Sequence, residues 1–135
     1  MAREWSEGRT AVKLLSEAQS ENCLFVKREF EVTVGGLTRK LDHFHFKGWE
    51  DFSTPCGAGL AGYESLINDN ADFVREQFYK ENAADKQKLL VHCRAGMGRT
   101  GTTLALTNLA ITLREQGSVD DPQINVVSVV RRLRE

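Results

Sequence analysis

The pattern of apolar and polar side chains changes near the middle of the chain. Residues 23–46 alternate apolar and polar positions, as half-buried strands do, and Gly35-Gly36 interrupts the alternation. A pair of glycines between two such runs is typical of a tight β-hairpin. The next segment, residues 48–62, contains four glycines and Pro55 and is expected to form a loop.

Helical spacing begins after this loop. Between residues 63 and 82, apolar side chains recur three and four positions apart, which predicts a helix; they are Leu66, Ile67, Phe73, Val74 and Phe78. A charged turn then leads to the short apolar run of residues 88–91, which is expected to form a buried strand.

Two further helices are predicted in the last third of the chain. Residues 100–116 have a strongly helical pattern that ends at Gly117, and glycine suits the left-handed position just past a helix. The last helix is expected to cover residues 121–135, with Asp121 as its N-cap and Pro122 in its first turn.

Length and composition describe one ordinary globular domain of the α/β class. The 135 residues leave room for one domain, and 41% hydrophobic with 27% charged residues is usual for a soluble protein. The net charge of -1 gives no reason to expect nucleic acid as a partner. No apolar run reaches the roughly 18 residues that a membrane span needs. Three cysteines indicate reduced thiols and a cytoplasmic location rather than a disulfide framework.

The segment VHCRAGMGRTG, residues 91–101, carries the candidate chemistry. Cys93 follows the expected strand and precedes a helix N-terminus, where free N–H groups and the helix dipole favour a thiolate. The glycines of the segment permit conformations in which successive N–H groups converge on an anion. The planar fork of Arg99 can hold two oxygens of a phosphate and its charge can lower the thiol pKa, while Thr100 can donate its hydroxyl to the sulfur. These groups together suit the binding of a phosphate dianion against a sulfur nucleophile.

The glycines also match two other phosphate-binding patterns, but less well. Residues 96–101 and residues 57–62 both have the spacing of a dinucleotide-binding fingerprint, although the second follows Ser-Thr-Pro-Cys rather than a strand. Residues 96–101 also have Walker A spacing, but Thr102 stands where that motif needs a lysine. Nucleotide hydrolysis is therefore a poor candidate.

The motif His92-Cys93-x5-Arg99-Thr100 resembles the active-site loop shared by cysteine-dependent phosphatases. With Ala95 and the glycines at 96, 98 and 101 also in place, it is most similar to the loop of the protein tyrosine phosphatase family. The resemblance implies that Cys93 is the nucleophile and that His92, Arg99 and Thr100 belong to the catalytic set. The residues that it implies in binding the substrate phosphate are Arg94, Ala95, Gly96, Met97, Gly98 and Arg99.

A second block, HFHFKGWEDFSTP at residues 43–55, is similar to the strand and loop that carry the family's general acid. Trp49 and Asp51 fit this pattern, and the resemblance implies that Asp51 protonates the leaving tyrosine oxygen. Glu50 stands where the family pattern has a proline, a difference that concerns how the loop moves and closes.

The resemblance covers most of the chain and implies a fold, a reaction and a partner. The fold would be the tyrosine phosphatase type of α/β fold: a twisted mixed sheet flanked by helices, with the Cys93 loop between a strand and a helix N-terminus. The reaction would be hydrolysis of phosphotyrosine in protein substrates through a phosphocysteine intermediate, with no metal or organic cofactor. Tyrosine-specific members have further segments at both ends, so residues 1–135 are expected to be the C-terminal part of such a domain.

Two alternative functions stay open. A dual-specificity phosphatase is favoured by the short length, but the block containing Trp49 and Asp51 argues against it. A module that binds phosphotyrosine with little or no turnover is the second alternative.

Three other sites are weaker candidates. His43 and His45 alternate on a strand and share one face, but no third metal ligand lies nearby, which favours packed sheet positions. Cys56 could form a reversible disulfide with Cys93 under oxidation, although a plain loop thiol is favoured. Cys23 is expected to lie in the core.

Overall fold

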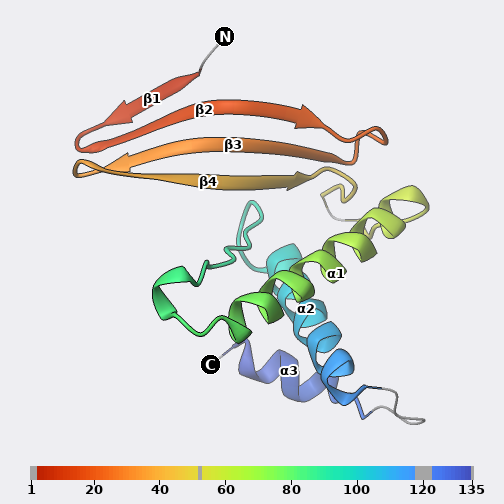
Figure 1. Cartoon of the computed structure of the whole chain (residues 1–135). Coiled ribbons are helices and arrows are strands. Elements are labelled where there is room, and N and C mark those ends of the chain that lie inside the picture. Colours follow the sequence, from red (N-terminus) through yellow and green to blue (C-terminus); the bar gives the residue numbers. More distant parts are fainter. Residues whose placement is uncertain (1–2, 52, 118–122, 135) are drawn as a thin grey trace. The chain divides into compact units, whose positions relative to one another are not determined.

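The computed structural model describes residues 3–51, 53–117 and 123–134, which form two compact units. The first unit, Met1–Tyr63, is built on a β-sheet, and the second, Glu64–Glu135, is helical (Figure 1). This mixture of strands and helices agrees with the predicted α/β content.

The sheet of the first unit has four antiparallel strands in the order β1-β2-β3-β4 (Figure 1). The strands are β1 (Glu4–Glu7), β2 (Thr10–Gln19), β3 (Phe25–Val34) and β4 (Leu37–Phe46). The mixed sheet implied by the family resemblance is wrong for the described residues. Each strand is joined to its neighbour by a short turn, and a short turn connects only antiparallel strands.

The predicted hairpin is confirmed. Strands β3 and β4 pair in register from Val34 opposite Leu37, so Gly35 and Gly36 are the two loop residues. Their φ angles are +58° and +88°. Two successive positive φ angles define the tight turn whose twist matches that of the flanking strands, and glycine adopts them without strain.

Strands β1 and β2 were not predicted from the sequence. They form a second hairpin in which Glu7 is paired with Thr10 around a turn at Gly8, whose φ is +59°. The pairing of β2 with β3 shifts between Leu14 and Ser16, which marks a β-bulge. An extra residue at a bulge interrupts the alternation of side chains, so the sequence of β2 lacks a clean strand period.

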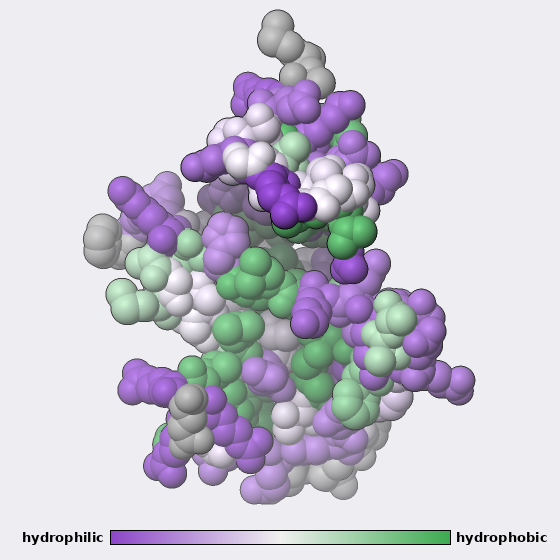
Figure 2. Space-filling model, turned by 90° about the vertical axis from the view of Figure 1, so that its left-hand side faces the viewer, coloured by the Kyte–Doolittle hydropathy of each residue, from purple (hydrophilic) through white to green (hydrophobic). Residues whose placement is uncertain are grey.

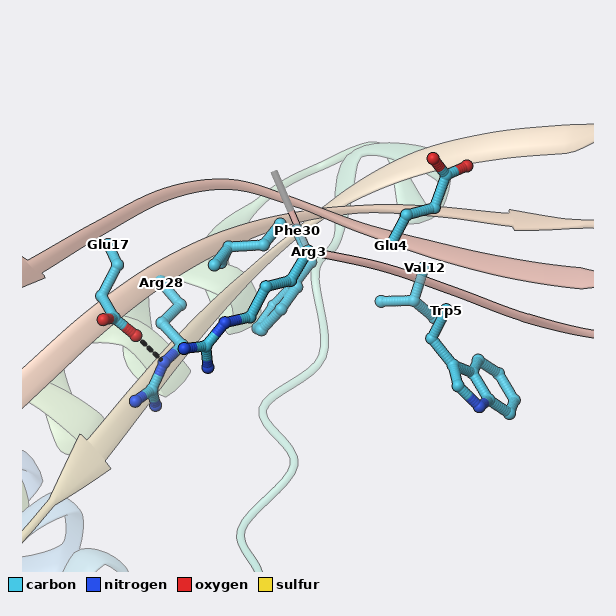
Figure 3. Close-up of a pocket in the computed structure, with 8 residues that line it drawn as sticks. Arg3, Glu4, Trp5, Val12, Glu17, Arg28 and Phe30 are labelled. Atoms are coloured by element: carbon cyan, nitrogen blue, oxygen red, sulfur yellow. Dashed lines mark hydrogen bonds and ion pairs between the residues drawn. The ribbon is translucent and has the colours of Figure 1, made fainter. Parts of the chain in front are cut away.

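One face of this sheet has a shallow recess with both aromatic and charged side chains (Figure 3). An ion pair between Arg28 and Glu17 lies across strands β2 and β3 at this recess. The lining residues are Arg3, Glu4, Trp5, Val12, Leu14, Glu17, Arg28 and Phe30. Charged side chains therefore cover part of the apolar surface on this side of the sheet.

The chain that follows β4 is held against the end of the sheet by aromatic packing. The ring centroid of Phe46 lies 5.1 Å from that of Phe25 and 5.8 Å from that of Tyr63. Gly62 fits against this cluster because it has no side chain: a Cβ there would meet Leu24 Cδ1 at 2.9 Å. This packing fixes the start of the first helix beside the sheet.

Helix α1 (Ala58–Tyr79) confirms the predicted helix, although it begins five residues earlier than residue 63 and ends before residue 82. The glycines in the first turns of α1 contributed to the predicted loop. Because glycine has no side chain, they allow these turns to approach the sheet closely. A short 3₁₀ turn, η1 (Ala83–Asp85), follows α1. Helix α2 (Gly98–Gln116) confirms the next predicted helix, and it ends at Gly117 with a φ of +67°.

The strand predicted at residues 88–91 is wrong, because this segment has no regular secondary structure. Leu90 is 84% exposed and Leu89 is 40% exposed. An apolar run becomes a strand only where another strand offers N–H and C=O groups, and the four strands of the described residues pair only with one another.

Helix α3 (Val126–Arg132) is shorter than the helix predicted over residues 121–135. Asn125 caps it, since its side-chain oxygen accepts a hydrogen bond of 2.9 Å from the N–H of Ser128. The predicted start at Asp121 and Pro122 lies outside the described residues. Because Asn125 is the N-cap, α3 begins later in the chain than the sequence pattern predicts.

The two units bury few apolar side chains. The buried apolar residues of the described chain are Val26, Tyr63, Ile67, Ala71 and Ala105, and hydrophobic residues reach the surface among charged ones (Figure 2). None of the helices in the described part of the chain combines the length and apolarity that a bilayer span requires. With so little burial, individual polar contacts contribute a larger share of the stability.

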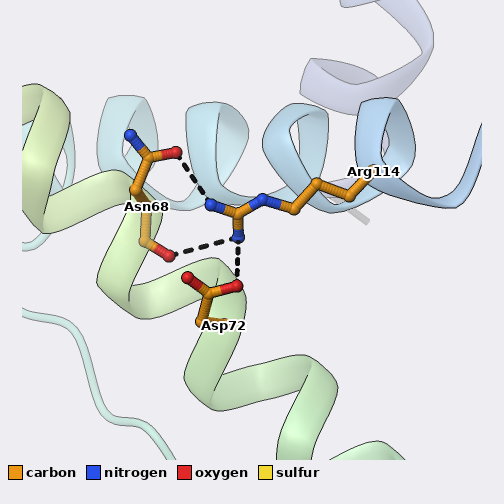
Figure 4. A network of polar contacts seen from close by, with 3 residues as sticks. All are labelled: Asn68, Asp72 and Arg114. Atoms are coloured by element: carbon orange, nitrogen blue, oxygen red, sulfur yellow. Dashed lines mark hydrogen bonds and ion pairs between the residues drawn. The ribbon is translucent and has the colours of Figure 1, made fainter. Parts of the chain in front are cut away.

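A network of polar contacts joins α1 to α2 within the second unit (Figure 4). Arg114 Nη1 donates to the backbone oxygen of Asn68 at 3.2 Å, and Nη2 donates to Asn68 Oδ1 at 2.9 Å. Arg114 Nη1 also lies 2.9 Å from Asp72 Oδ1. The guanidinium thus binds one turn of α1 from the C-terminal end of α2.

Replacing Arg114 with methionine is expected to lower the free energy of unfolding by about 1 kcal/mol, because three polar contacts are lost at a partly exposed site. Urea denaturation followed by circular dichroism measures this change. Arg131→Met is the matched control, since that exposed side chain forms no ion pair with the described residues. An equal loss in both variants would show that the contact with α1 contributes nothing.

Candidate active site

The Cys93 loop is an irregular segment that leads directly into helix α2. Residues 94–97 bend, and the helix begins at Gly98. Gly96 has a φ of +75°, a conformation that side-chain-bearing residues rarely adopt. The N–H of Gly96 donates a hydrogen bond of 3.2 Å to Cys93 Sγ. One loop N–H group therefore contacts the sulfur, and the convergence of successive N–H groups on a bound anion stays a prediction.

Thr100 lies in the first turn of α2 and is buried. Its hydroxyl oxygen forms no geometrically defined hydrogen bond with the described residues, yet it lies close enough to the sulfur of Cys93 to lower the pKa of that thiol. This hydroxyl is the largest cause of a lowered pKa of Cys93, which falls from 9.0 to about 6. The backbone N–H groups of Thr100, Gly96 and Ala95 lower the pKa further, and desolvation opposes them.

The direction of this shift favours the thiolate form of Cys93 at neutral pH. A thiol loses its proton as the pH rises through its pKa, so with a pKa of about 6 Cys93 is mostly a thiolate at pH 7. The thiolate, and not the thiol, attacks electrophiles. The predicted activation of Cys93 thus has an identified cause in the loop and in the first turn of α2.

Thr100→Val is expected to raise the pKa of Cys93, because the hydroxyl that stabilises the thiolate is removed while the shape is kept. The midpoint of the rate of alkylation by iodoacetate against pH should move from about 6 upward by on the order of one pH unit. Thr102→Val is the matched control: Thr102 Oγ1 donates to Gly98 O at 3.2 Å and does not lower the pKa of Cys93. An unchanged midpoint in Thr100→Val would contradict the assigned hydrogen bond.

The N-terminus of α2 offers further donors to an anion at this loop. The first N–H groups of a helix have no partner inside the helix, and Met97, which precedes α2, has no side chain that caps them. Their partial positive charge adds to that of the loop N–H groups. The arrangement has donors and positive charge on one side of a thiolate, which suits a bound phosphate.

Two other residues of the motif, Arg99 and His92, lie close to Cys93 in the chain. Arg99 is half-buried in the first turn of α2, and its backbone oxygen accepts a hydrogen bond of 2.8 Å from Thr103 Oγ1. His92 is exposed, with Nδ1 lying 3.3 Å from the backbone oxygen of Cys93. The binding of two phosphate oxygens by the guanidinium of Arg99 stays a prediction.

The predicted acid loop follows β4 in the first unit. The edge of Trp49 packs on Tyr63 with ring centroids 5.0 Å apart, and Trp49 Nε1 donates to Ser53 O at 2.8 Å. The hydroxyl of Ser53 donates to Glu50 O, also at 2.8 Å. These contacts close a tight turn that leaves Asp51 exposed. The anchoring role of Ser53 was not predicted, since a serine in a loop gives no distinctive pattern.

Comparison with known proteins identifies the family of this chain. The family model described as protein-tyrosine phosphatase matches residues 2–135, which include all of the described residues. The chain belongs to the protein-tyrosine phosphatase family. The predicted membership is thereby confirmed, and one family model spans both compact units.

Individual relatives are distant and longer than this chain. Tyrosine-protein phosphatase 3 of Schizosaccharomyces pombe is 31% identical over 107 residues, which cover 76% of this chain and 32% of the relative. The probable tyrosine phosphatase protein H4 of Microplitis demolitor bracovirus is 27% identical over 121 residues, or 89% of this chain and 64% of the relative. The receptor-type tyrosine-protein phosphatase V of Rattus norvegicus is 29% identical over 129 residues, 93% of this chain but 7% of that protein.

The structure brings together only part of the predicted catalytic set. Cys93 and Gly96 meet within the second unit through the hydrogen bond from Gly96 N to the sulfur, and Thr100 is close enough to lower the pKa of Cys93. Asp51 belongs to the first unit, so its approach to the phosphate bound at Cys93 stays a prediction.

The weaker candidates do not form a second site. The rings of His43 and His45 lie 6.2 Å apart, and the described residues contain no group of three side chains that could hold a metal ion. Cys56 is an exposed free thiol. The core position predicted for Cys23 is wrong: this residue is exposed in the turn between β2 and β3, with a φ of +58°. A turn that reverses the chain keeps this side chain at the surface.

Proposed function

We propose that this chain hydrolyses phosphotyrosine in protein substrates through a phosphocysteine intermediate. The observation that carries the proposal is the thiolate-stabilising environment of Cys93, whose pKa of about 6 is produced by Thr100 and the loop N–H groups. A low-pKa thiolate beside a helix N-terminus is the arrangement that attacks a bound phosphoester.

The first step of the proposed reaction transfers the phosphoryl group to sulfur. The Cys93 thiolate attacks phosphorus, an S–P bond forms, and the bond between phosphorus and the tyrosine oxygen breaks. Arg99 and the N–H groups of residues 94–99 hold the other phosphate oxygens as their charge is redistributed. Asp51 donates its proton to the leaving oxygen, so that tyrosine departs as a neutral phenol.

The second step regenerates the thiolate. Asp51, now ionised, accepts a proton from a water molecule as the water oxygen bonds to phosphorus. The S–P bond breaks, its electron pair returns to Cys93, and inorganic phosphate leaves. The proposed cycle uses only side chains and water, with no metal or organic cofactor.

The proposed location is the cytoplasm. The described cysteines are all free thiols, and a low-pKa thiolate that is accessible to solvent is readily oxidised. A reducing compartment keeps such a thiolate in the form that attacks phosphorus.

Phosphate release from matched phosphotyrosine and phosphoserine peptides tests the proposed function. We expect steady hydrolysis of the phosphotyrosine peptide and much slower hydrolysis of the phosphoserine peptide, measured as kcat/KM. Equal rates on the two peptides would favour a dual-specificity phosphatase. Binding of the phosphotyrosine peptide without phosphate release would favour a binding module that has lost turnover.

A further inference from the structure

The segment that leads to the Cys93 loop is bound to the C-terminal end of α1 by a buried side chain. Gln77 lies in the last turn of α1 and is only 7% exposed. Its Oε1 accepts a hydrogen bond of 2.9 Å from the backbone N–H of Gln87. Beside this contact, Lys86 Nζ donates to Phe78 O at 3.3 Å. Gln77 therefore fixes the backbone at one point shortly before the nucleophile, within the second unit.

Between this point and Cys93 the chain has few other contacts. Residues 88–91 have no regular secondary structure, and they form no hydrogen bond with the described residues. Leu90 is 84% exposed, so its side chain does not hold this stretch in place. After Cys93 the chain is fixed again at Gly98, where α2 begins. The nucleophile thus lies between two anchored points, Gln87 and the start of α2.

The groups that stabilise the thiolate all follow Cys93 in the chain. They are the side chain and N–H of Thr100 and the N–H groups of Gly96 and Ala95. Hydrogen bonds such as the 3.2 Å contact from Gly96 N to the sulfur weaken steeply when donor and acceptor move out of line. The position of the sulfur relative to these groups depends on the chain that precedes Cys93 as well as on α2. An anchor on the preceding chain therefore affects how closely the sulfur is held to them.

We propose that Gln77 is a positioning residue for the reaction at Cys93: its buried amide holds the preceding chain so that the sulfur stays against the groups that stabilise the thiolate. This inference rests on the proposed function, because it concerns the nucleophile of that reaction. Gln77 does not touch the substrate and acts through the backbone of Gln87. A buried amide suits this role, because water competes less for a hydrogen bond that is shielded from solvent.

Gln77→Met keeps the length of the side chain but removes the acceptor oxygen. The midpoint of Cys93 alkylation by iodoacetate against pH should move from about 6 upward by about half a pH unit, because the thiolate is held less closely to its donors. Gln77→Glu keeps an acceptor oxygen at the same place, and its midpoint should lie closer to that of the wild type. A wild-type midpoint in Gln77→Met, or equal shifts in the two variants, would overturn the proposal.

A change on the other side of the hydrogen bond gives an independent test. Gln87→Pro removes the N–H donor of an exposed residue. Lys86, with φ −73° and ψ 125°, already has the extended backbone that a following proline requires. Gln87→Pro should reproduce the shift of Gln77→Met, and the double variant should shift no further than either single one. Additive shifts would show that the two residues act separately and would contradict the proposal.

Arg114→Met separates positioning from a general loss of stability. This variant removes polar contacts between α1 and the C-terminal end of α2, which do not involve the segment before Cys93. Its alkylation midpoint should stay at the wild-type value although the protein is less stable. An upward shift as large as that of Gln77→Met would show that any loosening of this unit raises the midpoint, and the role of Gln77 would be refuted.

Hydrolysis of a phosphotyrosine peptide at two pH values connects the midpoint to the reaction. Relative to the wild type, kcat/KM of Gln77→Met should fall about twofold near pH 6 and little near pH 8, where Cys93 is almost entirely a thiolate in both proteins. The same pH dependence in both proteins would count against the positioning role. Absence of hydrolysis in the wild type would refute the proposed function instead, and the alkylation midpoints would still decide on Gln77.

Discussion

Cys93→Ser is expected to reduce hydrolysis of phosphotyrosine peptides by about 10⁴-fold or more, the scale on which the loss of a nucleophile acts. The groups around Cys93 stabilise a thiolate: the buried Thr100 is the first cause of its lowered pKa, and the N–H of Gly96 donates a hydrogen bond to the sulfur. A serine hydroxyl stays protonated in the same place because its pKa is far above that of a thiol. Phosphate release under saturating substrate measures the loss.

The matched control for this result is Cys56→Ser. Cys56 is an exposed free thiol in the loop before α1, and its structural contacts use its backbone oxygen, which accepts from Gly59 N at 3.0 Å. The same chemical change at this position should leave turnover close to that of the wild type. Similar turnover in Cys93→Ser and Cys56→Ser would show that Cys93 is not the nucleophile.

The parts of the fold that depend on local sequence were predictable. Gly35 and Gly36 specify their own turn, because two positive φ angles in succession demand glycine, and the strands on either side follow. The end of α2 at Gly117 follows from the same preference. The Cys93 loop is local as well: its donors lie within seven residues of the sulfur, so the motif predicts the contacts that lower the pKa of Cys93.

The errors arise where structure depends on distant neighbours. Residues 88–91 have the apolar composition of a buried strand, but the four strands of the described residues pair only with one another, and Leu90 is exposed. The bulge near Leu14 hides the period of β2, because the pairing partner on β3 and not the local sequence determines where the extra residue is accommodated. In the early turns of α1, Gly62 approaches Leu24, a neighbour that is distant in the sequence.

The candidate site also has one part that depends on local sequence and one part that depends on distant residues. Thiolate stabilisation needs only the Cys93 loop and the first turn of α2, and it is present in the structure. General acid catalysis needs a side chain from a different part of the chain, and Asp51 belongs to the other compact unit. Its role is therefore the part of the mechanism that an experiment must decide.

Asp51→Asn is expected to lower turnover of aryl phosphates with poor leaving groups by roughly 100-fold or more. The asparagine keeps the size of the side chain but has no proton to give to the departing oxygen. With a leaving group that is stable as an anion, the same variant should lose much less, since little protonation is needed. A series of aryl phosphates of increasing leaving-group pKa, measured with wild type and Asp51→Asn, shows the difference as a steeper dependence in the variant.

Glu50→Gln is the control that assigns this effect to one residue. Glu50 is the neighbouring carboxylate in the same exposed turn, and its backbone oxygen, which accepts from Ser53, is unchanged by the substitution. We expect the leaving-group dependence of Glu50→Gln to match that of the wild type. A steeper dependence in Glu50→Gln would transfer the role of acid to Glu50. Equal losses on good and poor leaving groups in Asp51→Asn would instead show that Asp51 supports the turn anchored by Trp49 and does not donate the proton.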